Sequence, residues 1–135
     1  MARKINDIEG IGPVYGEKLA AVDISTVEGL LEAGATKSGR KQLADESGIE
    51  EWRILDWVNM ADLFRITGVA SQFAELLKAA GVQTVKELRT RNAENLYEKL
   101  VEVQAEKNIT RAVPALSQVA DYIEQAKDLE PLVTY

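Results

Sequence analysis

Two short glycine-containing segments carry the residues best suited to bind a ligand. They are Gly10-Ile11-Gly12 and Gly68-Val69-Ala70, and a helix is predicted to begin directly after each. Glycine adopts positive φ angles and lets a ligand approach the backbone closely. The first N–H groups of a helix have no partner within the helix, and they lie at the positive end of its dipole. This combination is suited to binding a phosphate group.

The side chains near these segments extend the candidate site. Lys18 is the nearest basic residue after the first segment, and Ser71 follows the second segment directly. Glu9 and Glu17 flank the first segment and would repel a phosphate. The alternative interpretation is that both segments are structural turns that pack helices together. The candidate phosphate-binding residues are Gly10, Ile11, Gly12, Lys18, Gly68, Val69, Ala70 and Ser71.

The two segments belong to an internal repeat. Residues 8–27 match residues 66–85 without a gap, at a constant offset of 58 residues. From residue 8 to residue 30, eight positions are identical to those 58 residues later. Such a match indicates a duplicated structural unit. We therefore expect two units, 1–65 and 66–135, each with about four helices.

The expected fold class is all-α, with the two pseudo-repeated units packed as one compact domain around a shared core. Apolar residues recur at helical spacing nearly throughout the chain, and the alternating pattern of strands is absent. Side chains that can cap a helix N-terminus mark the expected helix starts. These capping residues are Ser25, Ser38, Ser47, Thr84, Asn92 and Ser117.

The last helix of each unit is also related in sequence. Residues 54–58 resemble residues 119–123, which places Trp57 and Tyr122 at equivalent positions. A long helix, about Glu50 to Leu63, precedes the second glycine segment, whereas no helix precedes the first. We expect the final helix to fold back beside the first glycine segment. If the final helix of a second copy did so instead, the result would be a swapped dimer.

Several aromatic and basic residues have expected environments. Tyr15, Phe73 and Trp57 are predicted to lie in the core, because they recur on apolar helix faces. Trp52 is expected to be partly exposed and is a candidate for contact with a partner, since aromatic side chains anchor interfaces. The basic pairs Arg40-Lys41 and Arg89/Arg91 are expected at solvated helix ends, and the alternative is that they extend a DNA-binding surface.

The composition excludes several kinds of site. The 135 residues include no cysteine and no histidine, which removes thiolate metal sites and the commonest general base. Carboxylate pairs such as Glu50-Glu51 lie at predicted helix starts, where acidic residues favour the helix dipole. No nucleotide-binding or nucleophile motif is present. We expect a protein that is not an enzyme and has no catalytic residues, metal or cofactor.

The chain also lacks the sequence signals of a membrane or secreted protein. No apolar run approaches the roughly 18–20 residues that span a bilayer. The first residues contain no apolar stretch of the kind found in a secretory signal. We expect a cytoplasmic protein with no membrane partner.

The glycine segments resemble those of tandem helix-hairpin-helix proteins. The motif residues are Ile8-Glu9-Gly10-Ile11-Gly12 with Leu19 to Thr26, and Ile66-Thr67-Gly68-Val69-Ala70 with Leu77 to Thr84. Similar hairpins occur in bacterial DNA ligases, in Holliday-junction binding proteins and in the C-terminal domain of the RNA polymerase alpha subunit. The whole chain resembles a bacterial family of stand-alone proteins of unknown function with two such units. The resemblance implies that both hairpins grip phosphates without reading sequence.

Two functions follow as expectations. The first is a non-catalytic module that binds a DNA backbone, independently of sequence, through both glycine segments. The second is a protein-interaction or assembly module, with a protein partner or a homo-oligomer, in which the glycine segments are purely structural. The net charge of −6 favours the second, because an acidic protein repels nucleic acid.

Overall fold

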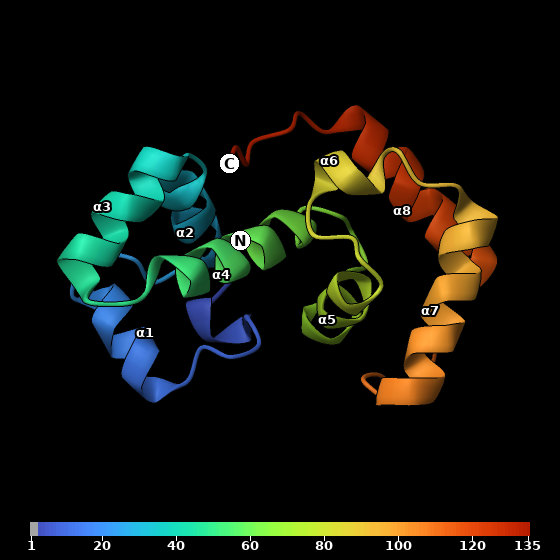
Figure 1. Ribbon diagram of the computed structural model, residues 1–135, viewed down its shortest axis with the longest axis horizontal. Helices are drawn as coiled ribbons and strands as arrows, with labels where there is room; N and C mark the ends of the chain where they lie inside the picture. Colours follow the sequence, from blue (N-terminus) through green and yellow to red (C-terminus); the bar gives the residue numbers. More distant parts are fainter. Residues whose placement is uncertain (1–2) are drawn as a thin grey trace. The chain divides into compact units, whose positions relative to one another are not determined.

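The computed structural model describes residues 3–135 and has an all-α fold (Figure 1). The chain divides into two compact units. Unit one contains the described residues up to Asp62 together with Leu132–Tyr135, and unit two contains Leu63–Pro131. Within residues 3–135 there is no strand, and the only β-type pairing is an isolated bridge of Lys4 with Thr26.

Each unit contains four main helices within the described part of the chain. α4 runs up to the boundary of unit one, and α2 packs against α3. In unit two, α8 packs against both α6 and α7, and α5 packs against α7. The elements of unit one are η1 (Ile5–Asp7, a 3-10 turn), α1 (Pro13–Ala20), α2 (Val27–Gly34), α3 (Lys37–Ser47) and α4 (Glu51–Leu63). The elements of unit two are α5 (Ser71–Ala79), α6 (Val85–Leu88), α7 (Ala93–Lys107) and α8 (Leu116–Asp128).

The first glycine segment forms a tight turn that leads into α1. We call residues Ile8–Gly12 glycine turn one. The N–H of Ile11 donates to the carbonyl oxygen of Ile8 at 3.2 Å, and Gly10 between them has a φ of +94°. A positive φ at the third position of such a turn is favourable only for glycine or a few polar residues. Pro13 then begins the helix, where its fixed φ is favourable.

The second glycine segment has the same local geometry. We call residues Ile66–Ala70 glycine turn two. The N–H of Val69 donates to the carbonyl oxygen of Ile66 at 3.1 Å, and Gly68 has a φ of +98°. Ala70 occupies the N-cap position of α5 in an extended conformation. An extended conformation is open to any residue, so alanine can occupy this position where glycine turn one has Gly12.

Both helices that follow the glycine turns end through a left-handed residue. Asp23 has a φ of 65° and follows α1, and Gly81 has a φ of 91° and follows α5. The N–H of Ile24 donates back to Leu19, and the N–H of Val82 donates back to Leu77, each at 2.9 Å. This six-to-one hydrogen bond is the Schellman pattern, which satisfies a carbonyl group at the helix end.

The capping predictions are confirmed in unit two for α6 and α7. The hydroxyl of Thr84 accepts from the N–H of Glu87, and the amide oxygen of Asn92 accepts from the N–H of Asn95. The prediction for Ser25 is wrong, because Thr26 is the N-cap of α2 and accepts from Gly29 at 2.9 Å.

Two further capping predictions are wrong. Thr36, not Ser38, is the N-cap of α3, and it accepts from the N–H of Gly39 at 3.1 Å. Ala115, not Ser117, is the N-cap of α8, and its N–H donates to the side chain of Gln118 at 2.9 Å. The cap of α2 lies one residue after the predicted position, and the caps of α3 and α8 lie two residues before theirs. For α2 and α3, neighbouring serine and threonine residues give the same sequence signal, and the packing of the helix selects one of them.

Each unit has its own buried apolar residues. In unit one they come from glycine turn one, from α1, α2 and α4, and from the loop between α1 and α2. They include Ile8, Ile11, Leu19, Ile24, Val27, Leu30, Ile54 and Trp57. In unit two they include Ile66, Val69, Leu77, Val82, Val85, Leu88, Leu100, Val119 and Ile123. The burial of Trp57 confirms its predicted core position, and Trp52 is 61% exposed, as expected. Tyr15 and Phe73 are only half-buried, which corrects their predicted core positions.

The environment of Arg40 differs from the prediction because of contacts with Leu132–Tyr135. The prediction that Arg40 lies at a solvated helix end is wrong, because the residue is only 3% exposed. Residues Leu132–Tyr135 return to unit one, where the carbonyl oxygen of Thr134 accepts from the Arg40 guanidinium at 2.6 Å (Figure 1). A segment distant in sequence thus buries a charged side chain.

Candidate functional site

The predicted site residues at glycine turn one separate into exposed and buried positions. Gly10, Gly12 and Lys18 are exposed, whereas the side chain of Ile11 is 4% exposed and belongs to the core. Ile11 can therefore offer only its backbone to a ligand. The structure brings together the exposed backbone of this turn and the start of α1.

Glycine turn two shows the same separation. Gly68 and Ala70 are exposed, Ser71 is half-buried, and Val69 is 1% exposed. The surface beside Ala70 and Ser71 is hollowed into a shallow depression of about 220 Å³. Val69 anchors the turn in the core, so its side chain is not part of a binding surface.

The N-terminus of α1 is open. Gly12 occupies the N-cap position and has no side chain with which to cap the helix, and Pro13 has no N–H group. Val14, the next residue, is 64% exposed. An anion could therefore reach the first turn of α1 from solvent.

The helix that packs on glycine turn one is α4, from the same unit. A Cβ atom on Gly10 would lie 3.4 Å from Nε1 of Trp57. The Trp57 ring also meets the Tyr15 ring edge to face, with centroids 5.2 Å apart. Trp57, from the same unit, thus provides an aromatic partner for this turn, and the expected approach of the final helix stays a prediction.

Two cations flank Tyr15 in the first turn of α1. The Arg53 guanidinium lies 5.2 Å from the centroid of the Tyr15 ring, and the Lys18 ammonium lies 5.7 Å from it. Arg53 also lies 4.4 Å from the Trp52 ring and forms an ion pair with Glu50 at 3.0 Å. Cation–π contacts of this kind hold a charge in place, and the ion pair with Glu50 offsets part of the charge of Arg53.

Arg53 is a candidate site residue that the sequence analysis did not name. It lies one helical turn before Trp57, so both side chains lie on the same side of α4. This spacing from the predicted core residue Trp57 is the signal that could have indicated it. The missing information was which of the two segments α4 covers.

Glycine turn two is held by side chains of α8. Gln125 accepts from the N–H of Thr67 at 2.8 Å and donates to the carbonyl oxygen of Thr67 at 3.2 Å. The Tyr122 hydroxyl donates to the carbonyl oxygen of Gly68 at 3.4 Å. Burial raises the pKa of the Tyr122 hydroxyl, and the negative charge of Asp121 adds to this. Polar groups of this turn are thus satisfied within unit two.

The cations beside glycine turn one have no counterparts at the matching positions of unit two. At the offset of the repeat, Lys18 corresponds to Leu76, which is 1% exposed. At the offset that relates Trp57 to Tyr122, Arg53 corresponds to Gln118, whose side chain caps α8. The two turns therefore share backbone geometry and differ in charge at these positions.

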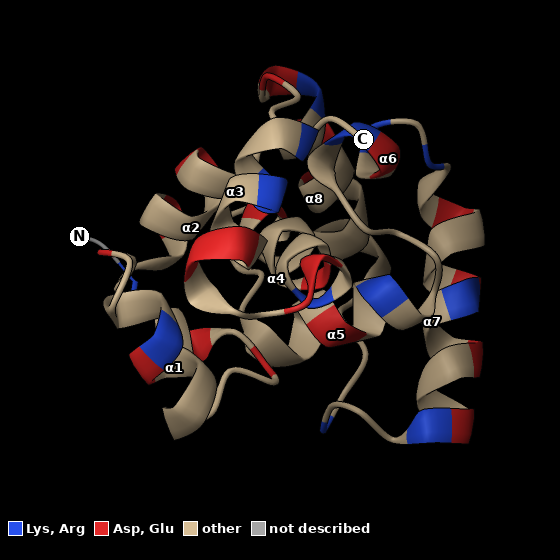
Figure 2. Ribbon diagram, turned by 60° about the vertical axis from the view of Figure 1, so that its left-hand side comes forward, with Lys and Arg blue, Asp and Glu red and all other residues tan. Residues whose placement is uncertain are grey.

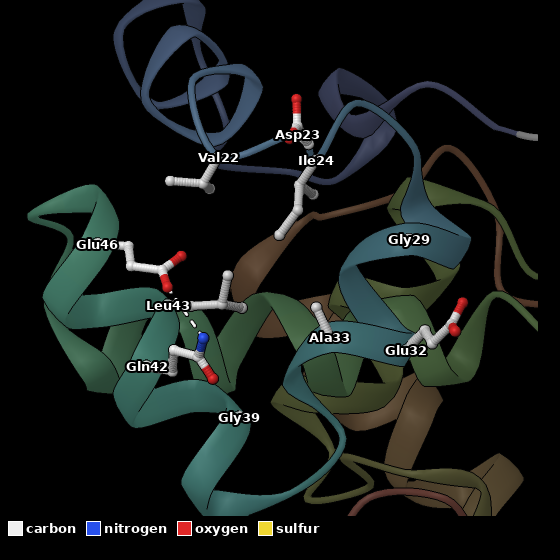
Figure 3. A pocket seen from close by; sticks show the side chains of 10 residues that line it. All are labelled: Val22, Asp23, Ile24, Gly29, Glu32, Ala33, Gly39, Gln42, Leu43 and Glu46. Carbon is white, nitrogen blue, oxygen red and sulfur yellow. Dashed lines mark hydrogen bonds between the residues drawn. The ribbon is translucent and has the colours of Figure 1, made fainter.

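A separate depression of about 530 Å³ lies in unit one, and acidic and apolar residues from the end of α1, from α2 and from α3 line it (Figure 3). Its centre is apolar, with Ile24 and Leu43 pointing into it, while Asp23 and Glu32 point away (Figure 3). Glu46 accepts a hydrogen bond from Gln42 at 2.9 Å. Among residues 3–135 no group of three or more potential metal-ligating side chains gathers here or elsewhere.

Acidic and basic side chains are mixed along most helices (Figure 2). α1 carries Glu17 beside Lys18, and α7 carries four acidic and two basic residues, whereas the charged residues of α2, Glu28 and Glu32, are both acidic. Attraction of an anion therefore depends on local groups, since the net charge of the chain is −6.

No helix in the described part of the chain combines the length and the apolar character needed to cross a membrane.

Comparisons with known proteins give one family match. Residues 9–129 match a domain of unknown function, DUF4332. Neither the curated proteins nor the solved structures contain a match to this chain. The matched range includes α1 and α4 of unit one and the α8 residues that hold glycine turn two. Because it covers most of the sequence, the protein belongs to the DUF4332 family.

Proposed function

We propose that the chain is a pair of helix-hairpin-helix units and that it acts as a non-catalytic binding module. Residues that correspond at the repeat offset are buried in both units, which supports a duplicated core. The pairs are Ile8 and Ile66, Ile11 and Val69, Leu19 and Leu77, Ile24 and Val82, Val27 and Val85, and Leu30 and Leu88. The matching φ angles of Gly10 and Gly68, and the N-caps Thr26 and Thr84, support the same interpretation.

The partner that this geometry favours is the phosphate backbone of a nucleic acid, bound chiefly at glycine turn one. The supporting observation is the pair of cations, Lys18 and Arg53, beside the open first turn of α1. A helix N-terminus and two cations can together hold one or two phosphates. Backbone contacts of this type carry no sequence information, so binding is independent of sequence.

Glycine turn two has a weaker role in this proposal. Thr67 donates its N–H to Gln125 within the unit, and the positions that match Lys18 and Arg53 carry no charge. Gly68 and Ala70 are exposed, so this turn offers a second, separate backbone contact for a phosphate. We expect substitutions at glycine turn one to affect binding more than substitutions at glycine turn two.

The test is binding to a labelled DNA duplex, followed by fluorescence anisotropy at low salt. Arg53→Glu and Lys18→Glu should each weaken binding about tenfold or more, and the slope of log K against log salt should fall by about one for each lost phosphate contact. Lys41→Glu, which changes an exposed residue of α3 by the same charge, is the matched control. Equal losses in all three variants, or no binding of the unmodified protein at low salt, would refute the proposal.

A protein-interaction role is the second candidate, and one observation favours it. Trp52 and Leu55 of α4, together with Tyr135, line an open depression of about 360 Å³ in unit one. Trp52 and Tyr135 are 61% and 64% exposed. Exposed aromatic side chains beside a depression are common at protein interfaces. In this case Tyr135→Ala would abolish partner binding and leave any DNA affinity unchanged, whereas Trp52 is unsuited to this test because it also contacts Arg53.

A further inference from the structure

The surface depression of about 530 Å³ in unit one has an apolar floor (Figure 3). Ile24 and Leu43 point into it and are only 4% and 6% exposed, so they form its floor rather than its rim. Val22 and Ala33 also line it, and both are half-buried. We call it the acidic depression, because the charged residues that line it are all acidic. A floor of this kind can receive an apolar side chain of a partner.

Three separate elements bring carboxylates to the rim of this floor. Asp23 follows α1, Glu32 lies in α2 and Glu46 lies in α3. All three residues are exposed, and no lysine or arginine is among the described residues that line the depression. Within residues 3–135, none of the three carboxylates has an ion-pair partner. A rim of one charge without counter-charges attracts a ligand of the opposite charge, so the acidic depression is complementary to a cation.

Unit two has an arginine of its own at the corresponding place. At the repeat offset of 58 residues, Ala33 corresponds to Arg91, and Asp23 corresponds to Gly81. Nη2 of Arg91 donates to the carbonyl oxygen of Gly81 at 3.0 Å. The N–H of Arg91 donates to the carbonyl oxygen of Leu88 at 3.1 Å, which gives this residue a helical turn where α2 has Ala33. Under the duplication proposed above, unit two therefore fills with its own guanidinium a place that Ala33 leaves open in unit one.

We propose that the acidic depression binds a basic segment of a protein partner, in which an apolar side chain is flanked by arginines. The apolar side chain lies on Ile24 and Leu43, and the arginines meet the carboxylates at the rim. Asp23 and Glu32 point away from the floor, so they are directed toward such flanking cations (Figure 3). Arginine is suited to this role because its forked guanidinium can bind a carboxylate through two hydrogen bonds. The acidic depression shares no residue with glycine turn one, so this binding is independent of the proposed DNA contact.

The test is an NMR titration of the isotope-labelled full chain with the synthetic peptide Gly-Arg-Ala-Leu-Ala-Arg-Gly at low salt. We expect saturable shifts of the backbone amide signals of Ala33, Gly39 and Leu43, and none at Gly81. A peptide with serine in place of leucine keeps both charges and should bind about fivefold more weakly or worse, because it loses the apolar contact. A peptide with glutamate in place of both arginines should not bind. These two peptides separate docking in the depression from general attraction between a cationic peptide and an acidic protein.

Two pairs of variants locate the site. Glu46→Lys should weaken peptide binding about tenfold or more, whereas Asp45→Lys, which changes an exposed residue of α3 outside the depression, should stay within about twofold.

Ala33→Arg supplies from within the chain the cation that unit two has, and it should weaken peptide binding at least as much. Ala105→Arg, the same change at an exposed residue of α7, is its control, and circular dichroism checks that each variant is folded. No shifts at millimolar peptide, equal binding of the serine peptide, or equal losses within either pair of variants would overturn the proposal. These measurements contain no nucleic acid, so their failure is distinct from a failure of the DNA-binding test.

Discussion

The hydroxyl of Tyr122 donates a hydrogen bond to the carbonyl oxygen of Gly68 at 3.4 Å, and the ring of Tyr122 lies against the same glycine. A Cβ atom on Gly68 would come within 3.2 Å of Cε1 of this ring. The glycine is thus required twice, once for its φ of +98° and once for the close approach of the ring. In unit one, Trp57 and Gly10 have the corresponding relationship, without the hydrogen bond from a hydroxyl.

Replacing Tyr122 by phenylalanine should change how stability depends on pH. Burial raises the pKa of the hydroxyl, so the folded state holds this proton more tightly than the unfolded state. The resulting stability is complete below the unfolded pKa of about 10 and is lost as the pH rises through the higher folded pKa. At neutral pH, Tyr122→Phe should cost about 1 kcal/mol for the lost hydrogen bond.

Urea unfolding at pH 7 and above pH 10 measures this difference. The gap between the unmodified protein and Tyr122→Phe should narrow at the higher pH, because only the unmodified protein loses stability from Tyr122. A gap that is constant or grows with pH would contradict the burial of a neutral hydroxyl at Gly68.

Gly10 and Gly12 provide a matched pair for testing backbone strain. Gly10→Ala should lower the free energy of unfolding by about 1–2 kcal/mol, because an L-residue at positive φ is strained. Gly12 has a φ of −89° and a Cβ atom there would meet nothing within 4 Å, so Gly12→Ala should cost about 0.5 kcal/mol or less. Thermal unfolding followed by circular dichroism distinguishes the two, and equal losses would exclude the proposed role of the positive φ.

Arg40 should contribute more to stability than the adjacent Lys41. Arg40→Met leaves the carbonyl groups of Gly34, Ala35 and Thr134 without this donor, and we expect a loss of about 2 kcal/mol. Lys41 is exposed, so Lys41→Met should stay within about 0.5 kcal/mol of the unmodified protein. Chemical denaturation measures both values, and similar values for the two variants would show that the burial of Arg40 contributes nothing.

Substitutions of Thr26 and of the preceding Ser25 test which of the two residues caps α2. Thr26→Ala removes the oxygen that accepts from Gly29, at an expected cost of about 1 kcal/mol. Ser25→Ala changes an exposed side chain next to the cap and should cost less than about 0.5 kcal/mol. The reverse order in an unfolding experiment would place the cap at Ser25.

Local features of the fold could be predicted from the sequence. The caps at Thr84 and Asn92, the burial of Trp57 and the exposure of Trp52 follow from residue type and helical spacing, which act over a few residues. The sequence could not predict that Thr26 rather than Ser25 caps α2. Both hydroxyls lie close enough to the first turn of the helix, and tertiary packing selects one of them.

Contacts between segments that lie far apart in the sequence were harder to predict. The repeat placed Trp57 and Tyr122 at equivalent positions, yet it did not indicate which glycine turn each would cover. The sequence predicted a solvated helix end for Arg40 because Thr134, whose carbonyl oxygen accepts from its guanidinium, lies 94 residues away in sequence. The pairing of Arg53 with Tyr15 was hidden for the same reason, since it requires knowing that α4 packs on α1.

The contact between Ala35 and Thr134 also bears on the order of events during synthesis. The two residues are 99 residues apart, so unit one cannot complete its contacts until residues 132–135 have been made. Segments made early usually fold first as the chain is synthesised. Here the residues of unit two, Leu63–Pro131, are made before the segment that completes unit one. The unit that the ribosome begins first is therefore the second to receive all of its residues.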